Sequence, residues 1–138
     1  MVPIDYSKLH ILVIEDETFT LELTCALLRS LGVERVTGCQ DSEESFLELE
    51  RARPDIIFCD IRMAGMDGRQ FLRQVRAAEA ETPHRTPIVF LTSDTGLAAR
   101  EPQVDGYLVK PVDRDQIQDR IDKIVAADES LRERLAAM

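Results

Sequence analysis

Charged and hydroxyl side chains follow four short apolar runs of the sequence, and their types suit one kind of chemistry. The run LHILVI leads into Glu15-Asp16-Glu17, IIFCD ends on Asp60, IVFLT ends on Thr92, and YLV is followed by Lys110. If these runs are parallel strands, their carboxyl ends meet at one edge of a sheet. Carboxylates pressed together there repel one another unless a cation holds them, and a hard divalent ion such as Mg²⁺ prefers oxygen ligands. We therefore expect a Mg²⁺ site at this edge.

The same edge carries groups that suit a phosphoryl group. Lys110 offers a compact positive charge to a phosphate oxygen, and Thr92 offers a hydroxyl. A carboxylate can attack phosphorus and form an aspartyl phosphate, which makes Asp60 the candidate nucleophile. The residue types predict phosphoryl transfer to Asp60.

Apolar runs and helical periods alternate along the chain, as expected of an α/β fold with a parallel sheet. The predicted strands are Leu9–Ile14, Arg35–Cys39, Ile56–Asp60, Ile88–Thr92 and Tyr107–Val109. The predicted helices are Thr18–Leu31, which Gly32 ends, then Asp41–Ala52, about Gly68–Glu79, and a last helix that begins near Asp113. Right-handed crossovers would place helices on both faces of the sheet.

Length and composition narrow the class of protein. The chain has 138 residues, 44% of them hydrophobic, and a net charge of −9. This size suits one globular domain, and the negative charge argues against a nucleic-acid surface. No apolar run is long enough to span a membrane, and Cys25, Cys39 and Cys59 form no C-x-x-C pair. We expect a cytoplasmic protein without membrane contact, in which the cysteines are core residues.

Four motifs together resemble the receiver domains of two-component response regulators, in a chemotaxis-regulator-like form. These motifs are LVIEDE, FCDIRMAGMDG, FLTS and GYLVKP, and they occur in the family's order between about Leu9 and Val125. The resemblance implies a doubly wound, flavodoxin-like α/β fold with a five-stranded parallel sheet of order 2-1-3-4-5. It also implies a signalling switch that slowly hydrolyses its own phosphoryl group, and not a metabolic enzyme.

The resemblance assigns a role to each matching position. Asp60 looks like the phospho-acceptor. Asp16, Asp60 and the backbone carbonyl of Arg62 look like the Mg²⁺ ligands, with Glu15 acting through a bound water. Thr92 resembles the switch hydroxyl, Lys110 the lysine that pairs with the phosphoryl group, and Tyr107 the switch aromatic.

The family also implies partners. A sensor histidine kinase or a histidine phosphotransfer protein would supply the phosphoryl group, and a downstream protein or a missing output domain would read the switch. Of three alternative functions, one stays open and two are disfavoured. A receiver that binds partners without phosphorylation is possible, whereas a phospho-aspartate hydrolase of the haloacid-dehalogenase type would need an acid where Arg62 stands. A flavin-binding protein would not place acids in its first loop.

Two departures from the family pattern concern the mouth of the site and the segment after it. Arg62 and Asp94 carry opposite charges beside the path of attacking water, and we hypothesise that they pair and tune the lifetime of the phosphoryl group; two separate exposed side chains are the equal alternative. The segment between Thr92 and Lys110 is short, and Gly96 and Pro102 bracket few helix-forming residues. A shortened fourth helix is expected.

The C-terminal stretch continues the apolar repeat of the last helix. Ile117, Ile121, Ile124, Leu131, Leu135 and Met138 recur in steps of four and three, interrupted at Asp128. A continuous helix from Asp113 would extend about 39 Å. We accordingly divide the chain into a receiver domain, 1–126, and a helical extension or linker, 127–138. The extension is interpreted either as a coiled-coil seam that forms a homodimer or leads to an output domain, or as a polar tail.

Overall fold

A computed structural model describes residues 3–63, 67–93, 96 and 101–136 of the chain. Its elements in chain order are the 3-10 helix η1 (Tyr6–Lys8), β1 (His10–Ile14), α1 (Thr18–Ser30), β2 (Arg35–Cys39), α2 (Ser42–Ala52), β3 (Ile56–Asp60), α3 (Gly68–Glu79), β4 (Ile88–Thr92), β5 (Tyr107–Val109), α5 (Arg114–Ala127) and α6 (Glu129–Arg134). The strands form one parallel sheet of order β2-β1-β3-β4-β5. The fold class and the strand order predicted from the sequence are confirmed.

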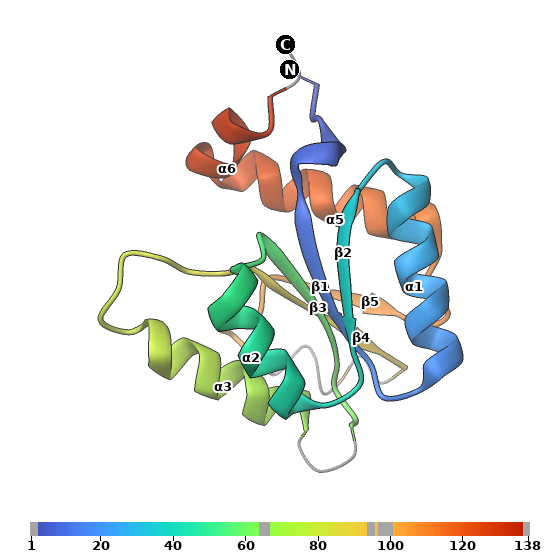
Figure 1. The fold of residues 1–138 in the computed structure, drawn as a ribbon, viewed down its shortest axis with the longest axis vertical. Coiled ribbons are helices and arrows are strands. Elements are labelled where there is room, and N and C mark those ends of the chain that lie inside the picture. Colours follow the sequence, from blue (N-terminus) through green and yellow to red (C-terminus); the bar gives the residue numbers. More distant parts are fainter. Residues whose placement is uncertain (1–2, 64–66, 94–95, 97–100, 137–138) are drawn as a thin grey trace.

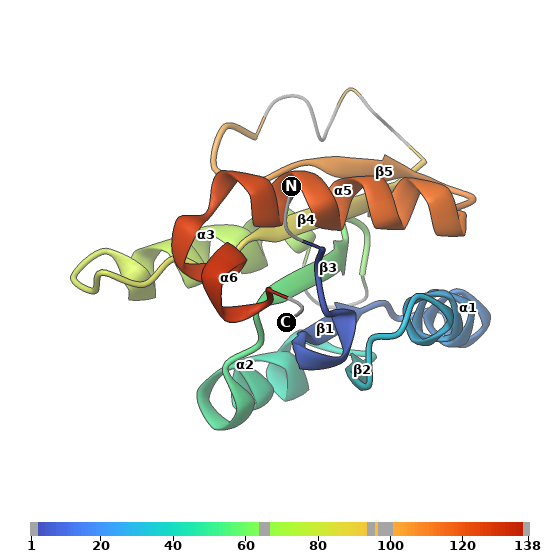
Figure 2. The same cartoon turned by 90° about the horizontal axis from the view of Figure 1, so that it is seen from above.

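Helices cover both faces of the sheet, with α2 and α3 on one side and α1 and α5 on the other (Figures 1 and 2). Alternate residues of each central strand enter one of two hydrophobic clusters. In β3, for example, Ile56 and Phe58 belong to the cluster under α1 and α5, whereas Ile57 and Cys59 belong to the cluster under α2 and α3. Burial on both faces explains why these strands are continuous apolar runs.

The expectations for Gly32 and for the cysteines are confirmed. Gly32 adopts φ +104°, a left-handed conformation that favours glycine, directly after the end of α1. All three cysteines are buried free thiols. Among the described residues, no helix is both long and apolar enough to cross a membrane.

The prediction of one continuous last helix is wrong. α5 ends at Ala127, and Asp128 has an extended backbone (φ −120°, ψ 103°). Its Oδ1 atom accepts a hydrogen bond of 3.0 Å from the backbone N–H of Leu131, so Asp128 caps a separate short helix, α6. The interruption in the apolar repeat is therefore a helix start.

α6 folds back onto the domain instead of projecting from it (Figure 1). Leu131 and Leu135 are buried in the same hydrophobic cluster as α1 and α5. The backbone N–H of Asp5 donates to the Leu135 carbonyl at 2.8 Å, and Ile4 forms an antiparallel bridge with Ala136. Because both leucines are buried in their own chain, they are not available for a coiled-coil seam between two copies, which is one of the two interpretations of this stretch.

Truncation of Leu135 tests this docking. We expect Leu135→Ala to lower the free energy of unfolding by about 2–5 kcal/mol, because it leaves a cavity in the core. Leu47→Ala, at an exposed position of α2, should change it by less than about 0.5 kcal/mol. Urea denaturation at two protein concentrations provides the measurement. Equal effects of the two variants, or stability that rises with concentration, would contradict the docked helix.

The predicted shortened fourth helix falls mainly on residues 94–95 and 97–100, which lie outside the described part of the chain. The described segment 101–106 consists of turns and irregular backbone. Two ion pairs hold it against α3: Arg73 to Glu101 at 2.7 Å and Arg76 to Asp105 at 3.0 Å.

Candidate functional site

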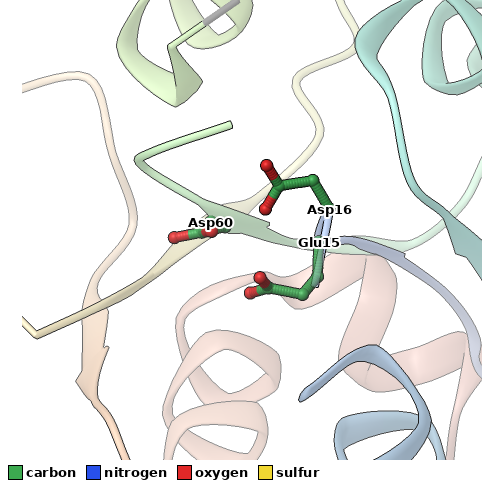
Figure 3. Close-up of side chains that lie close together, drawn as sticks. All are labelled: Glu15, Asp16 and Asp60. Atoms are coloured by element: carbon green, nitrogen blue, oxygen red, sulfur yellow. The ribbon is translucent and has the colours of Figure 1, made fainter. Parts of the chain in front are cut away.

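Three carboxylates gather at the carboxyl edge of the sheet, as the sequence predicts. Glu15 and Asp16 directly follow β1, and Asp60 ends the neighbouring strand β3. One carboxylate oxygen of each residue lies within 4.8 Å of the others. Figure 3 shows the three side chains converging from the ends of the two strands. Glu15 and Asp60 are 1% and 6% exposed, and Asp16 is more open to solvent.

Lys110 brings the compensating charge to this cluster from the end of β5. Its Nζ lies 2.9 Å from Glu15 Oε2 and 3.4 Å from Asp60 Oδ1. Its backbone N–H donates to the Thr92 carbonyl at 2.9 Å, which fixes the residue beside the end of β4. The lysine predicted to meet a phosphate oxygen therefore lies between two buried acids.

Burial and charge act on the same groups in opposite directions. Burial raises the pKa of Glu15 to about 7, and the negative charge of Asp60 adds to this rise, whereas the hydrogen bond from Lys110 opposes it. For Lys110, burial by itself lowers the pKa, but the hydrogen bond to Glu15 and the charges of Asp60 and Glu15 outweigh it, so the pKa is raised. Burial and the neighbouring Asp60 therefore oppose ionisation of Glu15, and Lys110 favours it.

This donor set fits a hard divalent cation. Glu15, Asp16 and Asp60 can each offer one oxygen to the same ion, and oxygen-only coordination suits Mg²⁺. Bound Mg²⁺ would offset the repulsion among the carboxylates, a task that Lys110 performs for two of them in this structure. The acidic cluster can thus bind a metal ion.

Glu17, the third acid of the Glu15-Asp16-Glu17 run, caps a helix. Both oxygens of the Glu17 carboxylate accept backbone hydrogen bonds at the start of α1, from Phe19 at 3.2 Å and Thr20 at 2.9 Å. The side chain is thus the N-cap of the helix, and it is not one of the three carboxylates that gather at the carboxyl edge of the sheet.

Thr92 and Tyr107 lie in different surroundings. Thr92 ends β4 between Asp60 and Lys110 in the strand order, and it is buried at the same edge as the carboxylates. Tyr107 is 37% exposed and lies at the start of β5, whereas Lys110 follows the end of this strand. The structure brings together Glu15, Asp16, Asp60 and Lys110 and places Thr92 at their edge of the sheet.

The loop after Asp60 is hydrogen-bonded to the Asp60 side chain. The backbone N–H of Arg62 donates to Asp60 Oδ1 at 3.3 Å, and the side chain of Arg62 is exposed. The predicted partner of that side chain, Asp94, lies outside the described residues. The structure therefore leaves the proposed charge pair untested.

Gly68 has a structural role that the sequence analysis did not assign. Its N–H donates to the Ile61 carbonyl at 2.6 Å, where α3 begins against the end of β3. An added Cβ would lie 2.9 Å from Ile61 Cα and closer still to the Asp60 carbonyl oxygen. The neighbouring pattern D-G-x-Q is a signal for this helix start, because Asp67 and Gln70 form a capping box.

Comparison with known proteins agrees with this geometry. The sequence model of the response regulator receiver domain matches residues 11–122. The positive alginate biosynthesis regulatory protein of Pseudomonas aeruginosa is 32% identical over 94% of this chain and 51% of its own length. The transcriptional regulatory protein ZraR of Salmonella typhimurium is 29% identical over 86% of this chain. The chain spans about a quarter of ZraR, 27% of its length.

Solved structures show the same likeness. The receiver domain of the sensor histidine kinase PA1611 from Pseudomonas aeruginosa is 34% identical, covers 83% of this chain and 95% of its own, and superposes with a TM-score of 0.72. That structure is described with a magnesium ion coordinated in its active-site cleft. The chemotaxis response regulator CheY4 of Vibrio cholerae, 24% identical, superposes with a TM-score of 0.71 over 84% of this chain and 98% of its own.

Substitution of Gly68 tests the close approach beneath the site. We expect Gly68→Ala to reduce the free energy of unfolding by about 1–3 kcal/mol, because backbone atoms of β3 would have to move. Gly38→Ala is the matched control, since its Cβ would meet the flexible end of Leu21 at 3.2 Å. Thermal or urea denaturation compares the two. A Gly68→Ala protein as stable as the Gly38→Ala protein would contradict the tight contact.

Proposed function

The chain belongs to the response regulator receiver domain family, and we propose that it accepts a phosphoryl group on Asp60 and works as a phosphorylation-controlled signalling switch. The observation that carries this proposal is the position of the Asp60 carboxylate. It lies 3.4 Å from the Lys110 ammonium and within reach of two further acids that can hold a divalent ion. A nucleophilic oxygen, a fixed positive charge and a metal site are the parts that phosphoryl transfer needs.

In the proposed reaction, an Asp60 oxygen forms a bond to phosphorus and the bond between phosphorus and the donor breaks. The bonding electron pair leaves with the donor, which is the imidazole nitrogen of a phosphohistidine or the acetate of acetyl phosphate. Mg²⁺, when bound, supplies positive charge to the phosphoryl oxygens. Lys110 turns from Asp60 to one of these oxygens, and the Thr92 hydroxyl donates to another.

The switch follows from the new charge. A phosphoryl group on Asp60 changes what Lys110 and Thr92 bind, and both adjoin β5, where Tyr107 is exposed. Movement of Thr92 toward the phosphoryl group and a turn of Tyr107 would then alter the surface of this strand. Attack of water on the acyl phosphate resets the protein slowly, and Arg62 beside the acceptor tunes that rate.

The proposed phosphodonor is a sensor histidine kinase or a histidine phosphotransfer protein. The chain would transmit the signal by binding a downstream protein or through an output domain beyond these 138 residues. This second possibility is motivated by the curated relatives, two of which are regulatory proteins longer than the matched region. A receiver that works without phosphorylation is the alternative, and the clustered acids and lysine favour the phosphorylated switch.

Intact-mass spectrometry tests the chemistry. After incubation with Mg²⁺ and acetyl phosphate, we expect one added phosphoryl group on the unmodified protein and none on Asp60→Asn, which lacks the anionic nucleophile. Asp55→Asn is the control, because Asp55 lies at the opposite end of β3. A phosphoryl group on the Asp60→Asn protein, or none on the unmodified protein even when beryllofluoride is tried as a mimic, would refute the proposal.

Titration calorimetry with Mg²⁺ tests the metal site. We expect Asp16→Asn to weaken Mg²⁺ binding by about tenfold or more, because one anionic oxygen ligand is lost. Asp119→Asn removes the same charge from the exposed surface of α5 and should change the affinity less than about twofold. Equal weakening in both variants would mean that the ion responds only to the net charge of the protein.

A further inference from the structure

The outer face of α2 exposes an apolar side chain among acids. Leu47 is 56% exposed, although Phe46 and Leu49 on the same helix pack partly against the core. A shallow groove of about 480 Å³ surrounds it. The residues lining this groove, which we call the α2 groove, are Asp41, Glu43, Glu44, Phe46, Leu47 and Glu50.

The α2 groove continues toward α3. A second groove of about 560 Å³ shares Phe46 and Glu50 with it and extends between the two helices over Leu49 and Val75. The Phe46 ring packs against Phe71 of α3, with ring centroids 4.9 Å apart, so the floor of both grooves is fixed by the core. A partner would therefore meet a preformed apolar strip.

The charge around the α2 groove has one sign, whereas Arg53 lines the second groove. Four of the six residues that line the α2 groove are acids, and none is basic. Within the described part of the chain, Glu43, Glu44 and Glu50 form no ion pair, whereas Glu48 on this helix pairs with Arg51 at 3.3 Å. Carboxylates that converge around an exposed leucine attract a cationic partner and repel nucleic acid and anionic lipid.

We propose that the α2 groove docks a basic amphipathic segment of another protein. An apolar side chain of that segment would cover Leu47 and Phe46, and its lysines or arginines would face Glu43, Glu44 and Glu50. This is the helix-in-groove mode of recognition, in which apolar contact supplies affinity and surrounding charge supplies selectivity. The proposal does not rest on phosphorylation, because none of these residues belongs to the Asp60 cluster.

The first test uses a helical peptide with leucine on one face and lysine on the other as the probe. Its binding is followed by fluorescence anisotropy, and its position by amide NMR shifts of the labelled full chain. We expect shifts centred on residues 41–50. A peptide in which glutamate replaces lysine should not bind.

Matched variants distinguish binding at the α2 groove from a general attraction of the basic peptide to a protein of net charge −9. We expect Glu43→Gln with Glu44→Gln to weaken peptide binding by about tenfold, as the loss of two charge contacts allows. The control, Asp115→Asn with Glu129→Gln, removes two exposed acids from the first turns of α5 and α6 and should change binding less than twofold. Leu47→Ala should also weaken binding, whereas Phe19→Ala, at an even more exposed side chain of α1, should not.

Two results would overturn the proposal. Equal weakening by the groove and control pairs, or NMR shifts centred on another surface, would show that the peptide responds only to net charge. Self-association that Leu47→Ala abolishes, measured by sedimentation without peptide, would assign the α2 groove to a second copy of this chain. None of these measurements depends on phosphorylation of Asp60. Failure of the α2 groove proposal is therefore distinguishable from failure of the proposed switch.

Discussion

Crowded negative charge at the carboxyl edge of the sheet is the constraint around which the rest of the site is arranged. Glu15 and Asp60 are almost fully buried, and two buried carboxylates side by side are unfavourable without a cation. The Lys110 ammonium, 2.9 Å from one and 3.4 Å from the other, supplies that cation within the chain. Charge added or removed at Asp60 would therefore change the surroundings of Lys110, which is the physical basis of the proposed switch.

The fold keeps these distances by fixing three strand ends independently of the charges. β1, β3 and β4 are buried on both faces, and Asp60 pairs in register with Leu91. The N–H of Lys110 is held by the Thr92 carbonyl, and α3 starts so close to β3 that only glycine fits at residue 68. Packing thus holds the acids together at a site where their mutual repulsion would separate them.

The sequence predicted the strands and the types of residue at their ends, because fully buried strands require continuous apolar runs and parallel topology brings their carboxyl ends together. It did not predict the break at Asp128. Leu131 and Leu135 keep the helical spacing across the break, so periodicity alone could not separate one helix from two. The contact of Gly68 with β3 and the sharing of Lys110 between two acids depend on long-range packing, which no local pattern encodes.

Part of the negative charge of this chain, whose net charge is −9, belongs to acidic side chains that cap helices. Six helices in the described part of the chain have an acidic N-cap, namely Asp5, Glu17, Asp41, Asp67, Asp113 and Asp128. These side chains accept backbone N–H groups and complement the helix dipoles, so their charge needs no partner to explain it. Glu43 and Glu44 lie in the first turn of α2, where they also complement the helix dipole, but Glu50 lies near the other end of this helix, and all three surround an exposed leucine. Their position, more than the total charge, is what argues for a basic partner at α2.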